Sequence, residues 1–186
     1  MQISIDGFIA GPNFEMDWVA LPWHEDLNQY VTELTKSIDT VLLGRKLAEG
    51  FIPYWASVAN DPNNVDLASG VLYTNIEKIV FTKTLQTENP IVQSWSNTQI
   101  NSGNLYDEVS ALKKAEGNDI IVYGGATFVS SLLKENLIDE LFLFINPMAL
   151  GRGQGIFQLL QQKQPYKLID SRSFDCEVVV LHYKLP

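Results

Sequence analysis

The chain has 186 residues, of which 46% are hydrophobic and 19% are charged, and its formal net charge is −9. This length suits one domain with a full hydrophobic core, and the composition is that of a globular protein rather than a disordered one. The negative charge argues against nucleic acid or an anionic membrane as the main partner, because both need a positive field. Every apolar run is shorter than the roughly 20 residues of a membrane span.

The cysteine and histidine content narrows the chemistry further. Cys176 is the single cysteine, which excludes an internal disulfide and favours a reducing compartment such as the cytoplasm. The chain has two histidines, His24 and His182, which are far apart in sequence, so no transition-metal site is expected. The N-terminus lacks the basic start and apolar stretch of a secretory signal peptide. We therefore expect an acidic, soluble, cytoplasmic protein with one domain, residues 1–186.

Hydrophobic spacing predicts strands that alternate with helices, followed by strands alone. The expected strands cover residues 1–10, 40–43, 78–82, 98–100, 119–123, 140–147, 166–174 and 177–185, and the expected helices cover residues 24–38, 46–51, 65–73, 105–115 and 126–135. The helix 46–51 is expected to end before Pro53, because proline disrupts a helix interior. This order predicts an α/β fold with a mainly parallel sheet and a C-terminal antiparallel hairpin.

Two polar segments directly follow predicted strands. The first is GRK, in which Gly44 permits a turn while Arg45 and Lys46 place two cations at the start of a helix. The second is TKT, where Thr82 and Lys83 supply a hydroxyl and a cation. In open α/β sheets, ligands gather beyond the carboxyl ends of the strands, where helix N-termini also offer free N–H groups.

A third segment, GGAT, follows the predicted strand 119–123. Gly124 and Gly125 either form a simple tight turn or leave room for a ligand against the backbone, and Thr127 can bond to an anion. Together the three strand ends offer what a phosphorylated dinucleotide needs, because arginine or lysine binds a 2′-phosphate. No G-x-G-x-x-G follows the first strand, so a Rossmann fold is not expected.

Five stretches together resemble a known superfamily: SIDGFIAGPN, LLGRKLAEGF, VFTKTL, VYGGATFVSSLL and LIDELFLFINPMALGRGQGIF. They span nearly the whole chain and are similar to dihydrofolate-reductase-like proteins, in particular the bacterial group close to the reductase domain of riboflavin biosynthesis. The resemblance implies a three-layer fold around a mixed, mainly parallel sheet of about eight strands, with NADPH as the cofactor. Relatives often pair through sheet edges, so a homodimer is also expected.

The resemblance assigns the cofactor contacts residue by residue. They are Ile9 and Ala10 beside the nicotinamide, Gly44, Arg45 and Lys46 at a helix N-terminus, Thr82 and Lys83 near the adenosine ribose and its phosphate, and Gly124, Gly125, Ala126 and Thr127 along the pyrophosphate and nicotinamide. The peptide between the two glycines is cis in dihydrofolate reductases, and the same is expected here. Leu47 stands where the family has threonine.

The expected reaction is hydride transfer from NADPH to a C=N or C=O bond of a flat heterocycle, such as a pterin or a pyrimidine. Asp26 is the candidate for binding a ring N–H or relaying the proton; alternatively, it only stabilises the N-terminus of its helix. Asp6 is a candidate substrate-binding residue or, alternatively, the cap of a turn.

Four aromatic residues could form a wall that stacks the substrate ring: Phe51, Tyr54, Trp55 and Tyr123. The same residues could equally belong to the hydrophobic core. Two other functions stay open. One is a non-catalytic NADP(H)- or ligand-binding homodimeric module that retains the fold, and the other is a true dihydrofolate reductase, which would bind methotrexate tightly.

Overall fold

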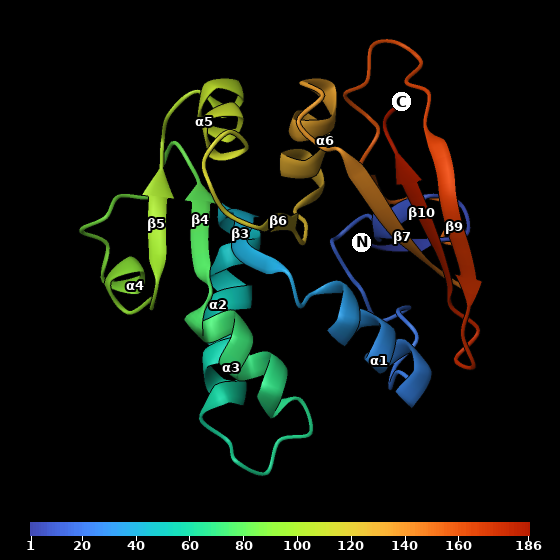
Figure 1. The fold of residues 1–186 in the computed structure, drawn as a ribbon, viewed down its shortest axis with the longest axis horizontal. Helices are drawn as coiled ribbons and strands as arrows, with labels where there is room; N and C mark the ends of the chain where they lie inside the picture. Colours follow the sequence, from blue (N-terminus) through green and yellow to red (C-terminus); the bar gives the residue numbers. More distant parts are fainter. The chain divides into compact units, whose positions relative to one another are not determined.

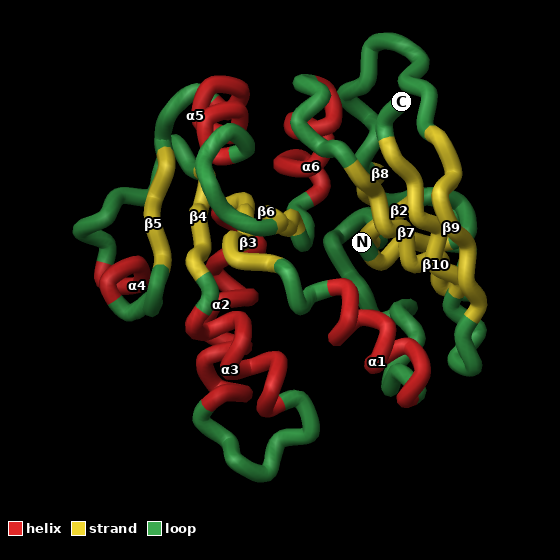
Figure 2. Tube along the Cα trace, in the orientation of Figure 1, coloured by secondary structure: helices red, strands yellow, loops and turns green.

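The computed structural model describes residues 1–186 and contains two compact units. The first unit comprises residues 1–36 and 126–186, and the second comprises residues 37–125. Figure 1 labels their helices and strands, and Figure 2 shows how regular structure and loops alternate along the chain. The assignment of residues 1–186 to a single domain stays a prediction.

The second unit is built on a four-stranded parallel sheet in the order β5-β4-β3-β6 (Figure 1). Its strands are β3 (Ile38–Gly44), β4 (Glu77–Phe81), β5 (Thr98–Asn101) and β6 (Asp119–Val122), and its helices are α2 (Arg45–Ala59), α3 (Leu67–Asn75), α4 (Pro90–Gln93) and α5 (Leu105–Leu112). The central strand β3 is covered on both faces, since Leu42 and Leu43 point to opposite sides and are at most 1% exposed.

The main core of this unit includes inward-facing residues of the sheet and the apolar faces of α2 and α3. Val41 and Leu43 of β3 and Val80 of β4 are fully buried there, together with Ile52 of α2 and Tyr73 of α3. In β3, Val41 and Leu43 face this core, whereas Leu42 between them faces the other side of the sheet, because successive side chains of a strand point to opposite faces. The sequence predicted all four strands of this sheet.

Helix α2 continues past Pro53, so the prediction that it ends at residue 51 is wrong. Pro53 is exposed, whereas Ile52 and Val58 of the same helix are buried. Burying two such aliphatic side chains contributes about 3–6 kcal/mol. An interior proline costs about 3 kcal/mol. Burial of the apolar face therefore outweighs the loss of one backbone hydrogen bond.

The first unit holds a four-stranded mixed sheet in the order β1-β7-β10-β9. Its strands are β1 (Gln2–Ser4), β7 (Glu140–Asn146), β9 (Lys167–Ser173) and β10 (Val179–Lys184); β2 (Phe8–Ala10) pairs separately with β8 (Gln154–Gly155), and the helices are α1 (Glu25–Leu34) and α6 (Ala126–Lys134). β1 is parallel to β7, while β10 is antiparallel to both β7 and β9. The expected C-terminal hairpin is therefore confirmed.

Helix α1 packs against the sheet of the first unit through one apolar face. Leu27 is fully buried in a cluster with Phe144 of β7 and Val180 of β10, and Phe174 completes it just after β9. The predicted helix 24–38 is shorter than expected: it ends at Leu34, and Ile38 already belongs to β3. Each helix of the chain is too short or too polar to span a lipid bilayer.

Candidate active site

The parallel sheet of the second unit has a topological switch point between β3 and β6. The chain runs outward from β3 through β4 to β5, and it then returns to place β6 on the opposite side of β3. In register, Gly44 lies beside Phe81, and Leu42 lies beside Val122. The segments GRK, TKT and GGAT therefore leave the sheet at the same edge, which is the one formed by the carboxyl ends of its parallel strands. This edge of an open α/β sheet, at its switch point, is where ligands bind.

Helix α2 begins at this edge with its first N–H groups open. Its N-cap Gly44 is extended (φ −78°, ψ 150°) and provides no side-chain cap, and no acidic residue lies in the first turn. Such N–H groups, together with the helix dipole, form an anion-binding site. Arg45 and Lys46 add two cations. Leu47 packs against the core and adds no hydroxyl to this site.

The Arg45 guanidinium is held on the surface of α2. Its Nη1 donates to Glu49 Oε1 at 2.7 Å, and both side chains are more than one-third exposed. An exposed ion pair of this kind contributes at most about 1 kcal/mol. An anionic ligand can therefore replace Glu49 as the partner of Arg45 at little cost.

The turn after β4 is stabilised by its own side chains. Thr82 Oγ1 accepts hydrogen bonds from the N–H groups of Thr84 and Leu85, both at 3.1 Å. The Lys83 ammonium donates to Gly103 O at 2.9 Å and to the carbonyl before it. A lysine has three donors, so the exposed ammonium keeps one for a ligand. These bonds tie the ends of β4 and β5 together.

Gly124 and Gly125 follow β6 with φ values of 154° and 87°. Residues with a Cβ atom rarely adopt such angles, so this turn needs glycine for its backbone conformation. The expected cis peptide between the two glycines is wrong, because the cis peptide of this chain is Leu21–Pro22. Two positive φ angles turn the chain here with a trans peptide. Gly124 is buried and Gly125 is partly buried, so a ligand at this turn would contact mainly Gly125.

Three of the four predicted aromatic residues meet in one cluster of the second unit. Phe51 stacks on Tyr123 with centroids 5.5 Å apart and 27° between the planes, and Trp55 lies 6.1 Å from Phe51. The fourth, Tyr54, packs on Trp55 but is 54% exposed. Phe51, Trp55 and Tyr123 pack against the core yet stay partly buried. The rings therefore have a packing role and keep some surface that a flat ligand could contact.

Sequence analysis missed a further member of this cluster, Tyr73. Its ring is 6% exposed, lies 4.8 Å from that of Trp55 and crosses that of Tyr123 at 88° and 5.3 Å. The hydroxyls of Tyr73 and Tyr123 hydrogen-bond to each other. Burial raises the pKa of both hydroxyls, so they stay protonated at neutral pH. Fifty residues separate the two tyrosines, and no local pattern links them.

A buried lysine was also missed. Lys78 is 1% exposed, and its Nζ donates to the carbonyls of Tyr73 (3.0 Å), Thr74 (3.0 Å) and Ile76 (2.7 Å). This caps the C-terminus of α3, where the helix leaves carbonyls without partners. Burial lowers the pKa of Lys78 to about 8. A signal was present in the sequence, because Lys78 lies two residues before Val80 and so shares its buried face.

Asp6 lies in the turn between β1 and β2 of the first unit. Its carboxylate accepts hydrogen bonds from the N–H groups of Leu150 (3.0 Å) and Gly151 (2.6 Å), and from Ser4 Oγ (2.7 Å). These bonds, above all the one from Leu150, lower the pKa of Asp6 to about 2. They join two segments that are distant in sequence. This arrangement favours the turn-stabilising alternative, and substrate binding by Asp6 stays a prediction.

Asp26 lies in the first turn of α1. Its Oδ1 accepts from the N–H of Leu27 at 2.8 Å, and its Oδ2 accepts from the N–H of Asp175 at 2.9 Å. The bond from Asp175 is the main reason why the pKa of Asp26 lies below its ordinary value. The carboxylate is therefore ionised at neutral pH and carries no proton to relay. This favours a structural role, and the catalytic role of Asp26 stays a prediction.

The remaining predicted cofactor residues belong to the first unit. Ile9 and Ala10 lie in β2 and are 7% and 6% exposed, and Ala10 pairs with Gln154 of β8. Ala126 and Thr127 are the first residues of α6, and the side chain of Thr127 is exposed. Their contacts to a cofactor stay predictions.

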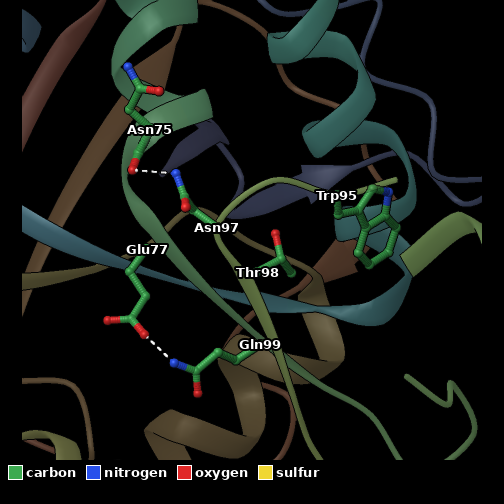
Figure 3. Close-up of a pocket in the computed structure, with 6 residues that line it drawn as sticks. All are labelled: Asn75, Glu77, Trp95, Asn97, Thr98 and Gln99. Carbon is green, nitrogen blue, oxygen red and sulfur yellow. Dashed lines mark hydrogen bonds between the residues drawn. The ribbon is translucent and has the colours of Figure 1, made fainter. Parts of the chain in front are cut away.

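A polar depression of about 510 Å³ lies at the opposite edge of the parallel sheet, where β4 and β5 begin (Figure 3). It is lined by Asn75, Glu77, Trp95, Asn97, Thr98 and Gln99. Gln99 Nε2 donates to Glu77 at 2.5 Å, and Asn97 Nδ2 donates to the carbonyl of Asn75 at 3.0 Å. Its one charged side chain is a carboxylate, so this depression does not suit a phosphorylated cofactor.

Comparison with known proteins places this arrangement in a family. Residues 1–180 match the RibD C-terminal domain. The chain belongs to the RibD C-terminal domain family. YyaP of Bacillus subtilis (strain 168), an uncharacterized protein, is 32% identical over 184 residues, which cover 98% of this chain and 91% of YyaP.

Two solved structures share the fold of this chain. A Thermotoga maritima diaminohydroxyphosphoribosylaminopyrimidine deaminase/5-amino-6-(5-phosphoribosylamino)uracil reductase has a TM-score of 0.69 and 19% identity, over 100% of this chain and 55% of that one. Dihydrofolate reductase from Enterococcus faecalis, complexed with NADP(H), has a TM-score of 0.56 and 16% identity, over 98% and 92%. These likenesses confirm the predicted dihydrofolate-reductase-like α/β fold.

Proposed function

We propose that this protein is an NADPH-dependent reductase of a small, flat heterocycle such as a pterin or a pyrimidine. The observation that carries the proposal is the alignment of three strand ends at the switch point between β3 and β6. They bring an uncapped helix N-terminus, cations and a two-glycine turn to one edge. Membership of the RibD C-terminal domain family and the fold shared with reductases support it.

The residues at this edge fit a phosphorylated dinucleotide. The open N–H groups of α2 suit the pyrophosphate, with Arg45 and Lys46 beside them. Thr82 and Lys83 follow the neighbouring strand β4 and suit the adenosine ribose and its 2′-phosphate. When bound, the nicotinamide supplies a hydride. The protein orients the substrate and excludes water, which together account for much of the rate in such enzymes.

Phe51, Trp55 and Tyr123 form the proposed face for the substrate ring, because these rings are only partly buried. This face includes no carboxyl group that could donate a proton. The carboxylates of Asp6 and Asp26 already accept hydrogen bonds from backbone N–H groups of their own unit. That engagement favours the second candidate function, a non-catalytic NADP(H)-binding homodimeric module. A module of this kind binds NADPH but does not consume it.

The first experiment is a titration of the purified protein with NADPH and, in parallel, with NADH. Preferential binding of NADPH is expected, because only NADPH carries the 2′-phosphate. NADPH consumption is then measured with pterins, pyrimidines and flavin precursors, and methotrexate binding tests a true dihydrofolate reductase. Binding without consumption of any substrate would support the module, and no binding of either nucleotide would refute both functions.

The homodimer and the cytoplasmic location are part of this proposal. β9 is an edge strand of the first unit, and all seven of its residues are exposed. An open edge strand is a template for pairing with a second chain. Light scattering measures the mass in solution, and introducing a proline in place of Ser171 should reduce a dimer to monomers if β9 forms the interface. The single cysteine supports a reducing compartment.

A further inference from the structure

The turn Gly124–Gly125 has no side chain of its own to hold it. Both glycines have positive φ angles, which glycine adopts far more readily than other residues, and neither has a Cβ atom that limits its backbone to one conformation. Ordering a flexible turn on binding reduces the affinity, so a turn that neighbouring residues hold in one conformation beforehand binds its ligand more tightly. The residue that precedes the turn, Tyr123, is therefore well placed to control it.

Tyr123 is fixed from two sides in the second unit. Its ring stacks on Phe51, and the edge of Tyr73 meets it at 5.3 Å. The hydrogen bond to the Tyr73 hydroxyl is the polar contact of its side chain. Because burial keeps both hydroxyls protonated, this bond persists over the working pH range. The ring of Tyr123 thus has a defined position directly next to the turn.

Tyr73 is itself a rigid support. It is 6% exposed in the core of the unit. The carbonyl of Tyr73 accepts a hydrogen bond from the buried Lys78 ammonium, which also binds the carbonyls of Thr74 and Ile76. Hydrogen bonds therefore hold Tyr73 at both its backbone and its side chain: its carbonyl accepts from Lys78 of β4, and its hydroxyl is bonded to that of Tyr123, which directly follows β6.

We propose that Tyr73 is a positioning residue that holds the Gly124–Gly125 turn, through Tyr123, in its binding conformation before the ligand arrives. This inference rests on the proposed function, because the nicotinamide half of NADPH is the ligand assigned to that turn. The adenosine half is assigned to the strand ends of β3 and β4, which Tyr73 does not hold. Tyr73 should therefore affect one half of the cofactor and not the other.

The test is Tyr73→Phe, which removes the hydroxyl and keeps the ring. Loss of one hydrogen bond predicts NADPH binding that is weaker by about three- to tenfold. Binding of 2′,5′-ADP, which carries only the adenosine half and its phosphate, should be unchanged. In the ligand-free protein, hydrogen exchange at the amides of Gly124 and Gly125 should be faster. Tyr106→Phe, which alters a tyrosine of α5 that is 53% exposed, is the matched control.

A double-mutant cycle sharpens the test. Tyr123→Phe should have the same effect as Tyr73→Phe, and the double variant should be no worse than either, since both remove the same bond. Unchanged glycine exchange in Tyr73→Phe would overturn the inference, as would an equal loss of affinity for NADPH and 2′,5′-ADP. Absence of NADPH binding by the natural protein would instead refute the proposed function, while glycine exchange would still report on Tyr73.

Discussion

The two units use their charged side chains in opposite ways. In the first unit, Asp6 and Asp26 are occupied by backbone N–H groups of distant segments. At the strand ends of the second unit, the first N–H groups of α2 have no cap, and Arg45 is paired only with the exposed Glu49. A polar group that the fold satisfies stabilises the fold, whereas one that it leaves open is available to a ligand. The contrast supports the proposal that the phosphate-binding groups lie in the second unit.

The largest effect is expected when cations are removed from the strand ends. Replacing both Arg45 and Lys83 by alanine should weaken NADPH binding by at least about 100-fold, because each charge-assisted hydrogen bond to phosphate contributes about 1.5–3 kcal/mol. NADH should be affected less, since it lacks the 2′-phosphate. Calorimetric titration measures both. Lys36→Ala and Lys134→Ala, at exposed lysines of the first unit, are the controls. An equal loss of NADPH affinity in the controls would contradict the proposal that the cations of the second unit bind the cofactor.

The ammonium of Lys78 in the second unit already donates to three backbone carbonyls, so its protonation should affect the stability of the fold. Its pKa is about 8 in the folded protein and 10.5 ordinarily, so between these values the unfolded chain binds more protons. The free energy of unfolding should therefore rise from pH 8 to 10.5, by up to about 3 kcal/mol, and stay independent of this group below pH 8. Urea unfolding of the natural protein and of Lys78→Met measures the difference. A slope of the same size in Lys78→Met would show that another group is responsible.

The glycine turn should be sensitive to a single methyl group. Gly125→Ala places a Cβ atom at φ 87° and should lower the free energy of unfolding by about 1–2 kcal/mol. NADPH affinity should fall as well, because the methyl group would stand where the ligand is proposed to contact the backbone. Urea unfolding measures the free energy of unfolding, and titration measures the NADPH affinity. Gly50→Ala is the control, since a Cβ atom there meets no other atom within 4 Å and φ is ordinary. Full NADPH affinity in Gly125→Ala would argue against a ligand at this turn.

Replacing Asp26 tests whether a satisfied carboxylate can still be catalytic. Asp26→Asn should lower stability slightly and leave turnover close to that of the natural protein, since the carboxylate is held by Asp175. Turnover of the best substrate and thermal unfolding are measured on the same preparation. A loss of turnover of about 100-fold or more, as general acid catalysis contributes, with unchanged stability would identify Asp26 as the proton donor.

The smallest effect is expected from Asp6, at acid pH. Its pKa is lowered from 3.8 to about 2, so its contribution to stability is present above about pH 4 and is lost as the pH falls through about 2. Asp6→Asn should unfold more easily than the natural protein at neutral pH and should approach it near pH 2. Fluorescence-monitored unfolding across this range measures the difference. NADPH affinity should not change, and a large loss would revive Asp6 as a ligand-binding residue.

Most strands and helices were predictable because they depend on local spacing. The glycines and cations at the ends of β3, β4 and β6 were found in the same way, since each segment directly follows a strand. Pro53 misled the prediction of α2, because the burial of Ile52 and Val58 depends on neighbours that sequence does not show. The prediction of a cis peptide between Gly124 and Gly125 was also wrong, because glycine can form a turn in several backbone conformations, and two positive φ angles with a trans peptide are one of them.

The sequence by itself determined the order of the elements, the type of fold and the three segments that meet at the switch point, because periodic and adjacent residues act locally. The tertiary structure alone decided which polar groups are occupied. Asp6 meets the N–H of Leu150 and Asp26 meets that of Asp175, each more than 140 residues away, while Tyr73 meets Tyr123 across fifty residues. Such contacts form only when distant segments pack together, so they leave no signal in the neighbouring sequence.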